Sequence, residues 1–385
     1  MYNILTLNKI SKSGLANFPA ADFTCADDFT NPDAVIVRSA SMHETEFGSN
    51  LLAIARAGAG VNNIPIDRCT ENGICVFNTP GANANAVKEL VICALFLASR
   101  KITAGVEWCK TLKGEGANVS KLVEKGKGHY VGPEIMGKTL GVYGLGAIGI
   151  KVANAASALG MDVIGYDPFL TDAAKNALAD GIKVTDNTDE LFAESDYITL
   201  HAPLNDATRG IICTDTLAKA KDGIRVLNFA RGELVAENDI IEALASGKCA
   251  AYATDFPTDA QLGVDGVIAI PHLGASTPEA EENCAVMAVC QLTDYLLNGN
   301  IKNSVNFPAL SSEKKGKVRI TAVTDGDASA TLAVALKDAG IAVNNSANAL
   351  RKNVGYCIFD TDNEITDETI EKLKETGSVK SIRII

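Results

Sequence analysis

The sequence has few histidines, no paired cysteines and no excess of positive charge, and each shortage excludes a class of function. Only four of its 385 residues are histidine, and its ten cysteines are scattered without a Cys-x-x-Cys pair or another metal-type spacing. This pattern is typical of small buried residues in a reducing cytosol, so we expect no metal site. The net charge of −12 argues against binding to nucleic acid and to an anionic membrane surface.

Long apolar runs are also missing. The sequence shows no N-terminal signal and no uncharged apolar run of about 18 residues, which is the length that a membrane-spanning helix needs. We therefore expect a cytoplasmic protein without a membrane partner. Its length suits two or three domains. Because the chain as a whole is acidic, an anionic substrate would have to be bound by locally placed arginines.

What the sequence does contain is a glycine-rich turn between a predicted strand and a predicted helix. Residues 140–143 form a short apolar run, Gly144-x-Gly146-x-x-Gly149 follows, and an apolar helical pattern continues to about residue 159. Gly144 would allow the tight turn, Gly146 would let a pyrophosphate approach the backbone, and Gly149 would let the helix pack closely against the strand. This pattern predicts a dinucleotide-binding unit.

A second predicted strand completes this unit. It covers residues 163–166 and ends at Asp167, near the expected position of a carboxylate that binds the adenosine ribose hydroxyls. The charge of Asp167 would repel a 2′-phosphate, which favours NAD over NADP. The pyrophosphate would lie on the unpaired amides at the helix N-terminus, which include those of Ala147 and Ile148.

Strand-like and helix-like segments alternate on both sides of this motif. The predicted strands are 4–7, 35–37, 53–57 and 74–78 before it, and 182–184, 197–200, 224–228, 251–255 and 267–270 after it. We also expect one helix from residue 85 to about 112, a loop over 113–137 and a long helix over 279–298. Such alternation predicts α/β domains with largely parallel sheets.

The C-terminal part has a different pattern. Residues 299–316 have the composition of a linker. After them come a strand, a helix, two strands, a helix and a strand, at 319–323, 329–339, 342–349, 355–360, 367–375 and 379–385. This order predicts a small ferredoxin-like βαββαβ domain.

Four side chains with acid–base or anion-binding chemistry follow predicted strands. Arg231 comes shortly after one strand, Asp255 and Asp259 lie at and beyond the end of another, and His272 follows a third. Ligands of open α/β sheets bind at the carboxyl ends of the strands, so we expect these side chains at a cleft. The planar fork of an arginine suits a carboxylate beside a carbonyl, and a histidine carries protons near neutral pH.

Four segments together carry a resemblance to a known family. They are Gly144-x-Gly146-x-x-Gly149, Leu200-His-Ala-Pro203-Leu, Asn228-Phe-Ala-Arg231-Gly and Pro271-His272-Leu-Gly-Ala. The chain resembles the D-2-hydroxyacid dehydrogenases over residues 1–306, and its C-terminal part is similar to the regulatory ACT domain of some members. The resemblance implies a flavodoxin-like substrate domain at 1–98, to which 276–306 return, a Rossmann-type NAD domain at 99–275, a linker at 307–316 and an ACT-like domain at 317–385.

The resemblance also implies a catalytic trio of Arg, Glu and His. Arg231 and His272 match it directly. The family acid lies in Asp-Val-Phe-x-x-Glu, whereas this chain has Asp255-Phe-Pro-Thr-Asp259, which is one residue shorter and ends in the shorter acid. We assign Asp259 to the carboxylate that stabilises the imidazolium. Arg231 would hold the substrate's carboxylate and C2 oxygen while His272 takes the hydroxyl proton.

The implied cofactor is NAD, and further residues match positions along it. Asp255 matches the acid that contacts the nicotinamide carboxamide. The other cofactor positions that the resemblance implies are His201, Pro203, Thr208, Ala230 and Gly274.

The distal end of the substrate is expected at the N-terminal part of the chain. Arg56 and the amides of Ala59, Gly60 and Val61 would bind a distal phosphate or carboxylate, with Arg38 assisting. The expected substrate is D-3-phosphoglycerate, and the expected assembly is a homo-oligomer, either a dimer or a tetramer. The alternatives are another D-2-hydroxyacid dehydrogenase, such as a hydroxypyruvate or glyoxylate reductase, and an NAD-sensing regulatory protein of the same fold.

Overall fold

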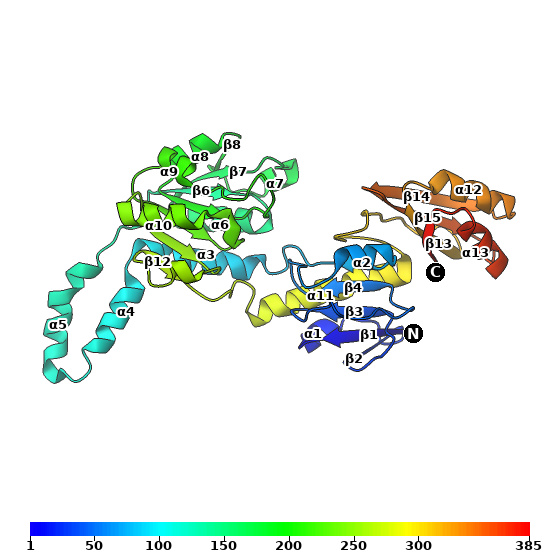
Figure 1. The fold of residues 1–385 in the computed structure, drawn as a ribbon, viewed down its shortest axis with the longest axis horizontal. Helices are drawn as coiled ribbons and strands as arrows, with labels where there is room; N and C mark the ends of the chain where they lie inside the picture. Colours follow the sequence, from blue (N-terminus) through cyan, green and yellow to red (C-terminus); the bar gives the residue numbers. More distant parts are fainter. The chain divides into compact units, whose positions relative to one another are not determined.

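A computed structural model describes all 385 residues, and the chain forms two compact units. The central unit comprises residues Ala84–Thr277, and the terminal unit combines Met1–Asn83 with Pro278–Ile385. Figure 1 shows the elements of each unit. None of the helices combines the length and the apolar character that crossing a membrane requires.

The central unit is built on one parallel sheet of seven strands. Its strand order is β12-β11-β10-β9-β6-β7-β8. The strands are β6 (Thr139–Tyr143), β7 (Asp162–Tyr166), β8 (Lys183–Thr185), β9 (Tyr197–Leu200), β10 (Ile224–Asn228), β11 (Cys249–Thr254) and β12 (Val267–Ala269). The chain runs outward from β6 through β7 and β8 and then returns to the other side of β6 at β9. This topology confirms the predicted Rossmann-type domain, in which ligands bind where the order reverses.

Helices cover both faces of this sheet. They are α3 (Ala84–Ser99), α6 (Ala147–Ala158), α7 (Asp172–Asn176), α8 (Thr188–Glu194), α9 (Thr214–Lys219) and α10 (Glu237–Ser246). Successive strand residues point to opposite faces, so Val142 packs in a core with α3 and α6, whereas Tyr143 packs in a core with α8, α9 and α10. The strands are apolar at consecutive positions because both of their faces are buried.

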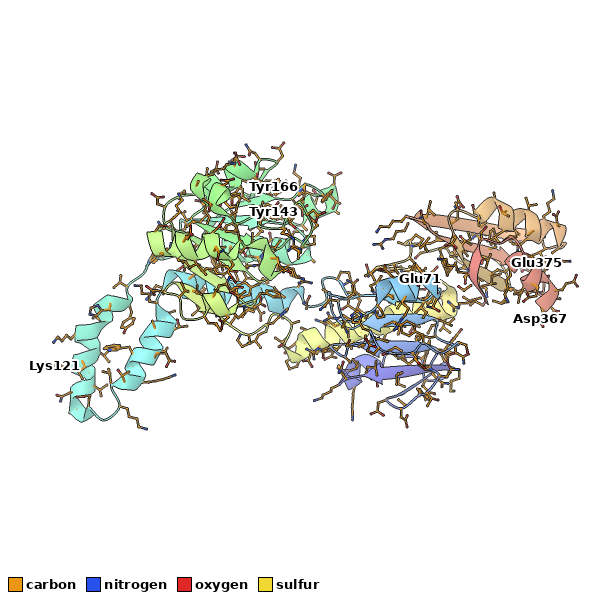
Figure 2. All side chains as sticks on the ribbon, in the orientation of Figure 1. Glu71, Lys121, Tyr143, Tyr166, Asp367 and Glu375 are labelled. Carbon is orange, nitrogen blue, oxygen red and sulfur yellow. The ribbon has the colours of Figure 1, made fainter.

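One segment of the central unit differs from the prediction. The expected helix over 85–112 is interrupted after Ser99, and the expected loop over 113–137 is wrong because most of it is helical. The segment contains α4 (Ile102–Thr111), η1 (Gly116–Asn118), α5 (Val119–Gly126) and η2 (Lys127–Tyr130). Figure 1 shows α4 and α5 projecting from the rest of the unit, and Figure 2 labels Lys121 on α5.

A ring contact links α4 to the end of this segment. The rings of Trp108 on α4 and Tyr130 in η2 stack with centroids 5.3 Å apart. Gly126 lies against the indole, since a Cβ there would come within 2.3 Å of it. No residue of α4 or α5 is buried. Helix α4 lies inside the expected helix over 85–112, whereas α5 lies in a stretch rich in Gly, Lys and Glu, whose composition predicted a loop.

The terminal unit contains a second parallel sheet, with the flavodoxin-like order β2-β1-β3-β4-β5. Its strands are β1 (Tyr2–Leu7), β2 (Phe23–Ala26), β3 (Ala34–Val37), β4 (Ala53–Arg56) and β5 (Cys75–Phe77), and its helices are α1 (Lys12–Leu15), α2 (Ile66–Glu71) and α11 (Pro278–Asn298). Figure 2 labels Glu71 at the end of α2. Helix α11 returns to this sheet from the far end of the sequence, and its Ala288 and Leu292 share a core with Ile36 and Ala55.

A four-stranded antiparallel sheet follows in the same unit. Its elements are β13 (Val318–Asp325), α12 (Ser329–Asp338), β14 (Val343–Arg351), β15 (Val354–Thr361), α13 (Asp367–Lys374) and β16 (Val379–Ile384). The strand order is β14-β15-β13-β16, which confirms the predicted βαββαβ arrangement. Asp367 and Glu375, labelled in Figure 2, mark the two ends of α13.

A buried ion pair between Arg319 and Asp360 connects this sheet to the end of α11. The guanidinium of Arg319 donates from Nε and Nη2 to the Asp360 carboxylate, at 2.7 and 3.0 Å, and both side chains are fully buried. Nη1 of Arg319 donates to the carbonyls of Asn298 and Ser312. Because these bonds satisfy a buried charge at the helix end, removing either charged partner would be strongly destabilising.

Candidate functional site

The glycine motif forms the turn between β6 and α6 that the sequence predicts. Gly144 has a φ of +98°, and a Cβ there would lie 2.8 Å from the backbone of His201. A Cβ on Gly149 would lie 1.9 Å from the Gly144 carbonyl oxygen, so only glycine lets the helix pack this closely. Nothing in the protein lies within 4 Å of a Cβ built on Gly146. Its open side therefore suits the close approach of a ligand.

Asp167 follows directly after β7 and is tied to this turn. Its Oδ2 accepts a hydrogen bond from the Leu145 amide at 2.9 Å, and its Oδ1 accepts one from the Phe169 amide at 2.9 Å. The carboxylate is thus fixed beside the glycine turn. Sequence reasoning missed the Leu145 amide, because a backbone donor leaves no signal in the side-chain pattern.

Two tyrosines lie next to each other at the carboxyl ends of β6 and β7. The rings of Tyr143 and Tyr166 have centroids 5.1 Å apart, and Figure 2 labels the pair. Burial raises the pKa of Tyr143, with smaller contributions from Tyr166 and Asp167. Tyr143 is therefore a neutral packing group beneath the glycine turn.

His201 lies just beyond β9 on the other side of the glycine turn. Its Nε2 is 3.0 Å from the Thr199 hydroxyl, while its Nδ1 is buried without a hydrogen-bond partner. Burial lowers the pKa of His201 to about 3, so the imidazole is neutral near pH 7.

The loop after His201 is held by its own hydrogen bonds. The Thr208 hydroxyl donates to the Pro203 carbonyl at 2.6 Å and accepts from the Asn205 amide at 2.9 Å. Thr208 is buried and Pro203 is exposed. The two predicted cofactor positions are therefore brought together, and Asn205 is the partner that the sequence did not single out.

Arg231 lies three residues beyond β10, and a buried asparagine shapes the turn that presents it. The Asn228 side chain accepts from the Ala230 amide at 3.2 Å and donates to the Arg231 carbonyl at 2.8 Å. The Arg231 guanidinium is exposed, and its Nη1 donates to the Ala230 carbonyl. Asn228 is thus a supporting residue whose role the sequence motif did not reveal.

Asp255, directly after β11, is the most unusual group of the central unit. It is only 3% exposed, and neither carboxylate oxygen has a hydrogen-bond partner in another residue. Burial raises its pKa to about 6, opposed by its own backbone N–H and by the charge of Arg231. Gly274 is buried beside it, since a Cβ there would lie 3.7 Å from Asp255 Oδ2. A buried acceptor without a donor fits a bound group that supplies N–H bonds, such as a carboxamide.

His272 lies just beyond β12, in the loop that leads to α11. His272 is exposed and makes an edge-on contact with Phe256, with ring centroids 4.6 Å apart. Asp259 begins η4 (Asp259–Gln261), and its side chain is exposed.

The predicted distal-binding residues lie in the terminal unit. Arg56 ends β4, and its Nε donates to the Arg38 carbonyl at 3.1 Å, so the two arginines are neighbours. The loop that follows carries Ala59, Gly60 and Val61. The Asn78 side chain holds this loop by donating to the Ala59 carbonyl at 2.7 Å.

The chain is similar to proteins of one family over most of its length. Residues 92–274 match the family model of the NAD-binding domain of the D-isomer-specific 2-hydroxyacid dehydrogenases. The hydroxypyruvate reductase of Thermotoga maritima is 40% identical over 269 residues, which are 67% of this chain and 82% of that protein. The D-3-phosphoglycerate dehydrogenase of Bacillus subtilis is 35% identical over 340 residues, which are 83% of this chain and 62% of that protein.

Solved structures show the same relationship. The crystal structure of NAD⁺-bound 3-phosphoglycerate dehydrogenase from Entamoeba histolytica aligns with a TM-score of 0.62 and 27% identity, covering 80% of this chain and 99% of that one. The chain spans 62%, 54% and 52% of the length of three curated phosphoglycerate dehydrogenases that it matches. From these similarities and from the glycine turn and strand-end residues, the chain belongs to the D-isomer-specific 2-hydroxyacid dehydrogenase family.

Proposed function

We propose that this protein is an NAD-dependent dehydrogenase that oxidises D-3-phosphoglycerate to 3-phosphohydroxypyruvate, the first step of L-serine biosynthesis. The observation that carries the proposed chemistry is the buried, unpartnered Asp255 carboxylate at a strand end of the domain that matches the family's NAD-binding domain. The choice of substrate is supported by the phosphoglycerate dehydrogenases among the relatives at 35–37% identity. It is also supported by the neighbouring Arg38 and Arg56.

NAD, when bound, accepts the hydride from C2 of the substrate. The amides at the start of α6, beyond Gly146, would hold its pyrophosphate, and Asp167 would accept hydrogen bonds from the adenosine ribose. Asp255 would accept from the nicotinamide carboxamide, which gives the buried carboxylate the donor that it lacks in the protein. The remaining residues proposed along the cofactor are Gly144, Ala147, Ile148, Gly149, His201, Pro203, Thr208, Ala230 and Gly274.

Three residues of the central unit are proposed to act on the reacting end of the substrate. Arg231 would bind the carboxylate and the C2 oxygen, because its fork matches two neighbouring oxygens. His272 would take the hydroxyl proton as the hydride leaves C2. Asp259 is the acid proposed to stabilise the resulting imidazolium, and hydrogen bonds of this kind often tighten only once substrate is bound. An unchanged pH profile of kcat/KM in Asp259→Asn would assign that role to another acid.

The phosphate end is assigned to the terminal unit. Arg56, assisted by Arg38, would neutralise the phosphate, and the amides of Ala59, Gly60 and Val61 would donate hydrogen bonds to it. In this proposal, residues 1–98 with 276–306 form the substrate-binding domain, and residues 99–275 form the NAD-binding domain.

Replacing Arg56 tests the substrate assignment. We expect Arg56→Ala to raise KM for D-3-phosphoglycerate about 10- to 100-fold, because a charge-assisted hydrogen bond contributes about 1.5–3 kcal/mol. KM for D-glycerate, which lacks the phosphate, should change by less than about threefold. Arg100→Ala, at an exposed arginine of the central unit, is the matched control. Equal effects of Arg56→Ala on both substrates would assign Arg56 to the fold instead.

One alternative substrate class has specific support. The hydroxypyruvate reductase relative is the most identical of the proteins compared above, at 40%. A reductase of this kind would reduce hydroxypyruvate or glyoxylate with NADH and would be indifferent to Arg56→Ala. An NAD-sensing regulatory protein would bind NAD without turning over any of these acids.

We also propose that residues 317–385 are an ACT-like domain that joins two copies of the chain, giving a dimer or tetramer. Strand β14 is an edge strand of nine residues, and its Leu350 is 53% exposed. Long exposed edges of this kind are templates for pairing with another strand. Light scattering should show a smaller assembly for Leu350→Lys than for the unaltered chain, and an unaltered chain that is monomeric would disprove the proposal.

A further inference from the structure

Two positive side chains leave the sheet of the terminal unit next to each other. Arg38 follows β3, and Arg56 ends β4, which pairs with β3 in parallel register. The Arg56 guanidinium lies over Gly58, where a Cβ would come within 2.0 Å of Nη1. Nε of Arg56 donates to the Arg38 carbonyl at 3.1 Å, so the two arginines lie at neighbouring strand ends. A negative partner stabilises a positive side chain such as Arg38 when no anionic ligand is bound.

The protein supplies that negative partner itself. Oε1 of Glu281 lies 2.6 Å from Nη1 of Arg38, with the two side chains 38% and 31% exposed. Glu281 is in the first turn of α11, where the helix dipole stabilises a carboxylate. Glu281 is therefore paired with Arg38, the arginine that is proposed to assist in binding the substrate's phosphate.

We propose that Glu281 is a specificity-determining residue that competes with the substrate's phosphate for Arg38. This inference rests on the proposed function of the Arg38–Arg56 pair. In the absence of substrate, the carboxylate neutralises Arg38. A phosphate dianion displaces it, because a phosphate offers more charge and more acceptor oxygens to the guanidinium fork than one carboxylate does. The uncharged hydroxymethyl end of D-glycerate cannot make this exchange.

The energies of the two interactions are compatible with such an exchange. A partly exposed ion pair contributes only about 0.2–1 kcal/mol, so displacing Glu281 weakens phosphate binding by a factor of about 1.5 to 5. The cost is small enough to permit turnover and large enough to measure. It applies only to ligands that carry an anionic group at this end.

The test compares Glu281→Gln with Glu282→Gln in the full chain. Glu282 is the exposed acid that follows Glu281 on α11, so it controls for a general change in charge. We expect Glu281→Gln to lower KM for D-3-phosphoglycerate about two- to fivefold and to leave KM for D-glycerate within about 1.5-fold. Glu282→Gln should leave both values unchanged.

A double variant shows whether the effect passes through Arg38. In the background of Arg38→Ala, Glu281→Gln should no longer lower KM for D-3-phosphoglycerate, because the competition has been removed. A rise in KM, or no change, in the single variant Glu281→Gln would overturn the proposal, since it would mean that Glu281 positions Arg38 and does not compete for it. An equal fall in KM for both substrates would overturn it as well.

Inorganic phosphate separates this inference from the proposed function. Calorimetric titration of the full chain should give a two- to fivefold lower Kd for phosphate in Glu281→Gln than in the unaltered chain. If the unaltered chain does not oxidise D-3-phosphoglycerate, the proposed function fails, and the phosphate titration alone decides the role of Glu281. An unchanged Kd in that titration would overturn the competition.

Discussion

The residues proposed to bind ligands are partnered differently in the two units. In the central unit, Asp255 is buried with no partner for its carboxylate, and one nitrogen of His201 is unpartnered as well. In the terminal unit, Arg56 donates to a carbonyl and Arg38 is paired with Glu281. The difference follows the chemistry of the ligand that each unit is proposed to bind. A neutral carboxamide can donate the hydrogen bonds that the Asp255 carboxylate lacks. The positive charge of Arg38, by contrast, is neutralised by Glu281 until an anionic ligand takes the place of that carboxylate.

The largest effect is expected at the proton acceptor of the central unit. His272→Ala should reduce kcat about 10²- to 10⁴-fold, because a positioned general base contributes that much. NAD binding, measured by calorimetry, should stay within about twofold, since the proposed cofactor contacts come from other residues. His129→Ala, at an exposed histidine of η2, is the matched control. Near-normal turnover of His272→Ala would remove this residue from the mechanism.

The next largest effect is expected at the ribose end of the cofactor site. Asp167→Asn should narrow the ratio of kcat/KM between NAD and NADP about 10- to 100-fold, because the amide no longer repels a 2′-phosphate. Its carbonyl oxygen can still accept from the Leu145 amide, so the turn should persist. Asp162→Asn, at the exposed start of β7, should leave the ratio unchanged. An unaltered ratio in Asp167→Asn would assign the cofactor preference to another residue.

An effect on stability, smaller than the two effects above, tests whether the buried Asp255 carboxylate lacks a hydrogen-bond partner. Its native pKa of about 6 lies above the ordinary aspartate value, so the folded chain binds more protons than the unfolded chain between about pH 4 and 6. The free energy of unfolding therefore falls as pH rises through this window. Without NAD, Asp255→Asn should be on the order of 1–2 kcal/mol more stable than the unaltered chain at pH 8, and this difference should vanish near pH 4.

Urea unfolding at the two pH values measures this difference. Asp265→Asn, an exposed acid of the same unit, should show no pH-dependent gain. If Asp255→Asn is less stable than the unaltered chain at pH 8, the charged Asp255 carboxylate does not destabilise the folded state.

The parts of the site that could be predicted from the sequence are those with local spacing rules. The three glycines and Asp167 lie within one strand–turn–helix–strand segment, so their separation along the chain determines their relative positions. Both sheets could be predicted for a related reason, because buried parallel strands are short apolar runs that alternate with helices. The βαββαβ order of the C-terminal sheet followed from the same alternation.

The parts that could not be predicted depend on contacts between distant segments. Arg38 and Glu281 are 243 positions apart in the numbering, and only the return of α11 to the first sheet brings them together. The isolation of Asp255 is a property of its surroundings, which no single segment encodes. Helix α5 was missed because it lies in a stretch rich in Gly, Lys and Glu, whose composition is typical of a loop, whereas α4 lies inside the helix expected over 85–112.

The substrate preference of the unaltered chain is the direct test of the proposal that this protein oxidises D-3-phosphoglycerate. Initial rates of NAD reduction should be measured with D-3-phosphoglycerate, D-glycerate and D-lactate, alongside NADH oxidation with hydroxypyruvate and glyoxylate. We expect a kcat/KM for D-3-phosphoglycerate at least about tenfold above that for D-glycerate, because only the phosphorylated acid makes the charge-assisted contact with Arg56. A higher kcat/KM for D-lactate or D-glycerate, or turnover of hydroxypyruvate alone, would contradict it.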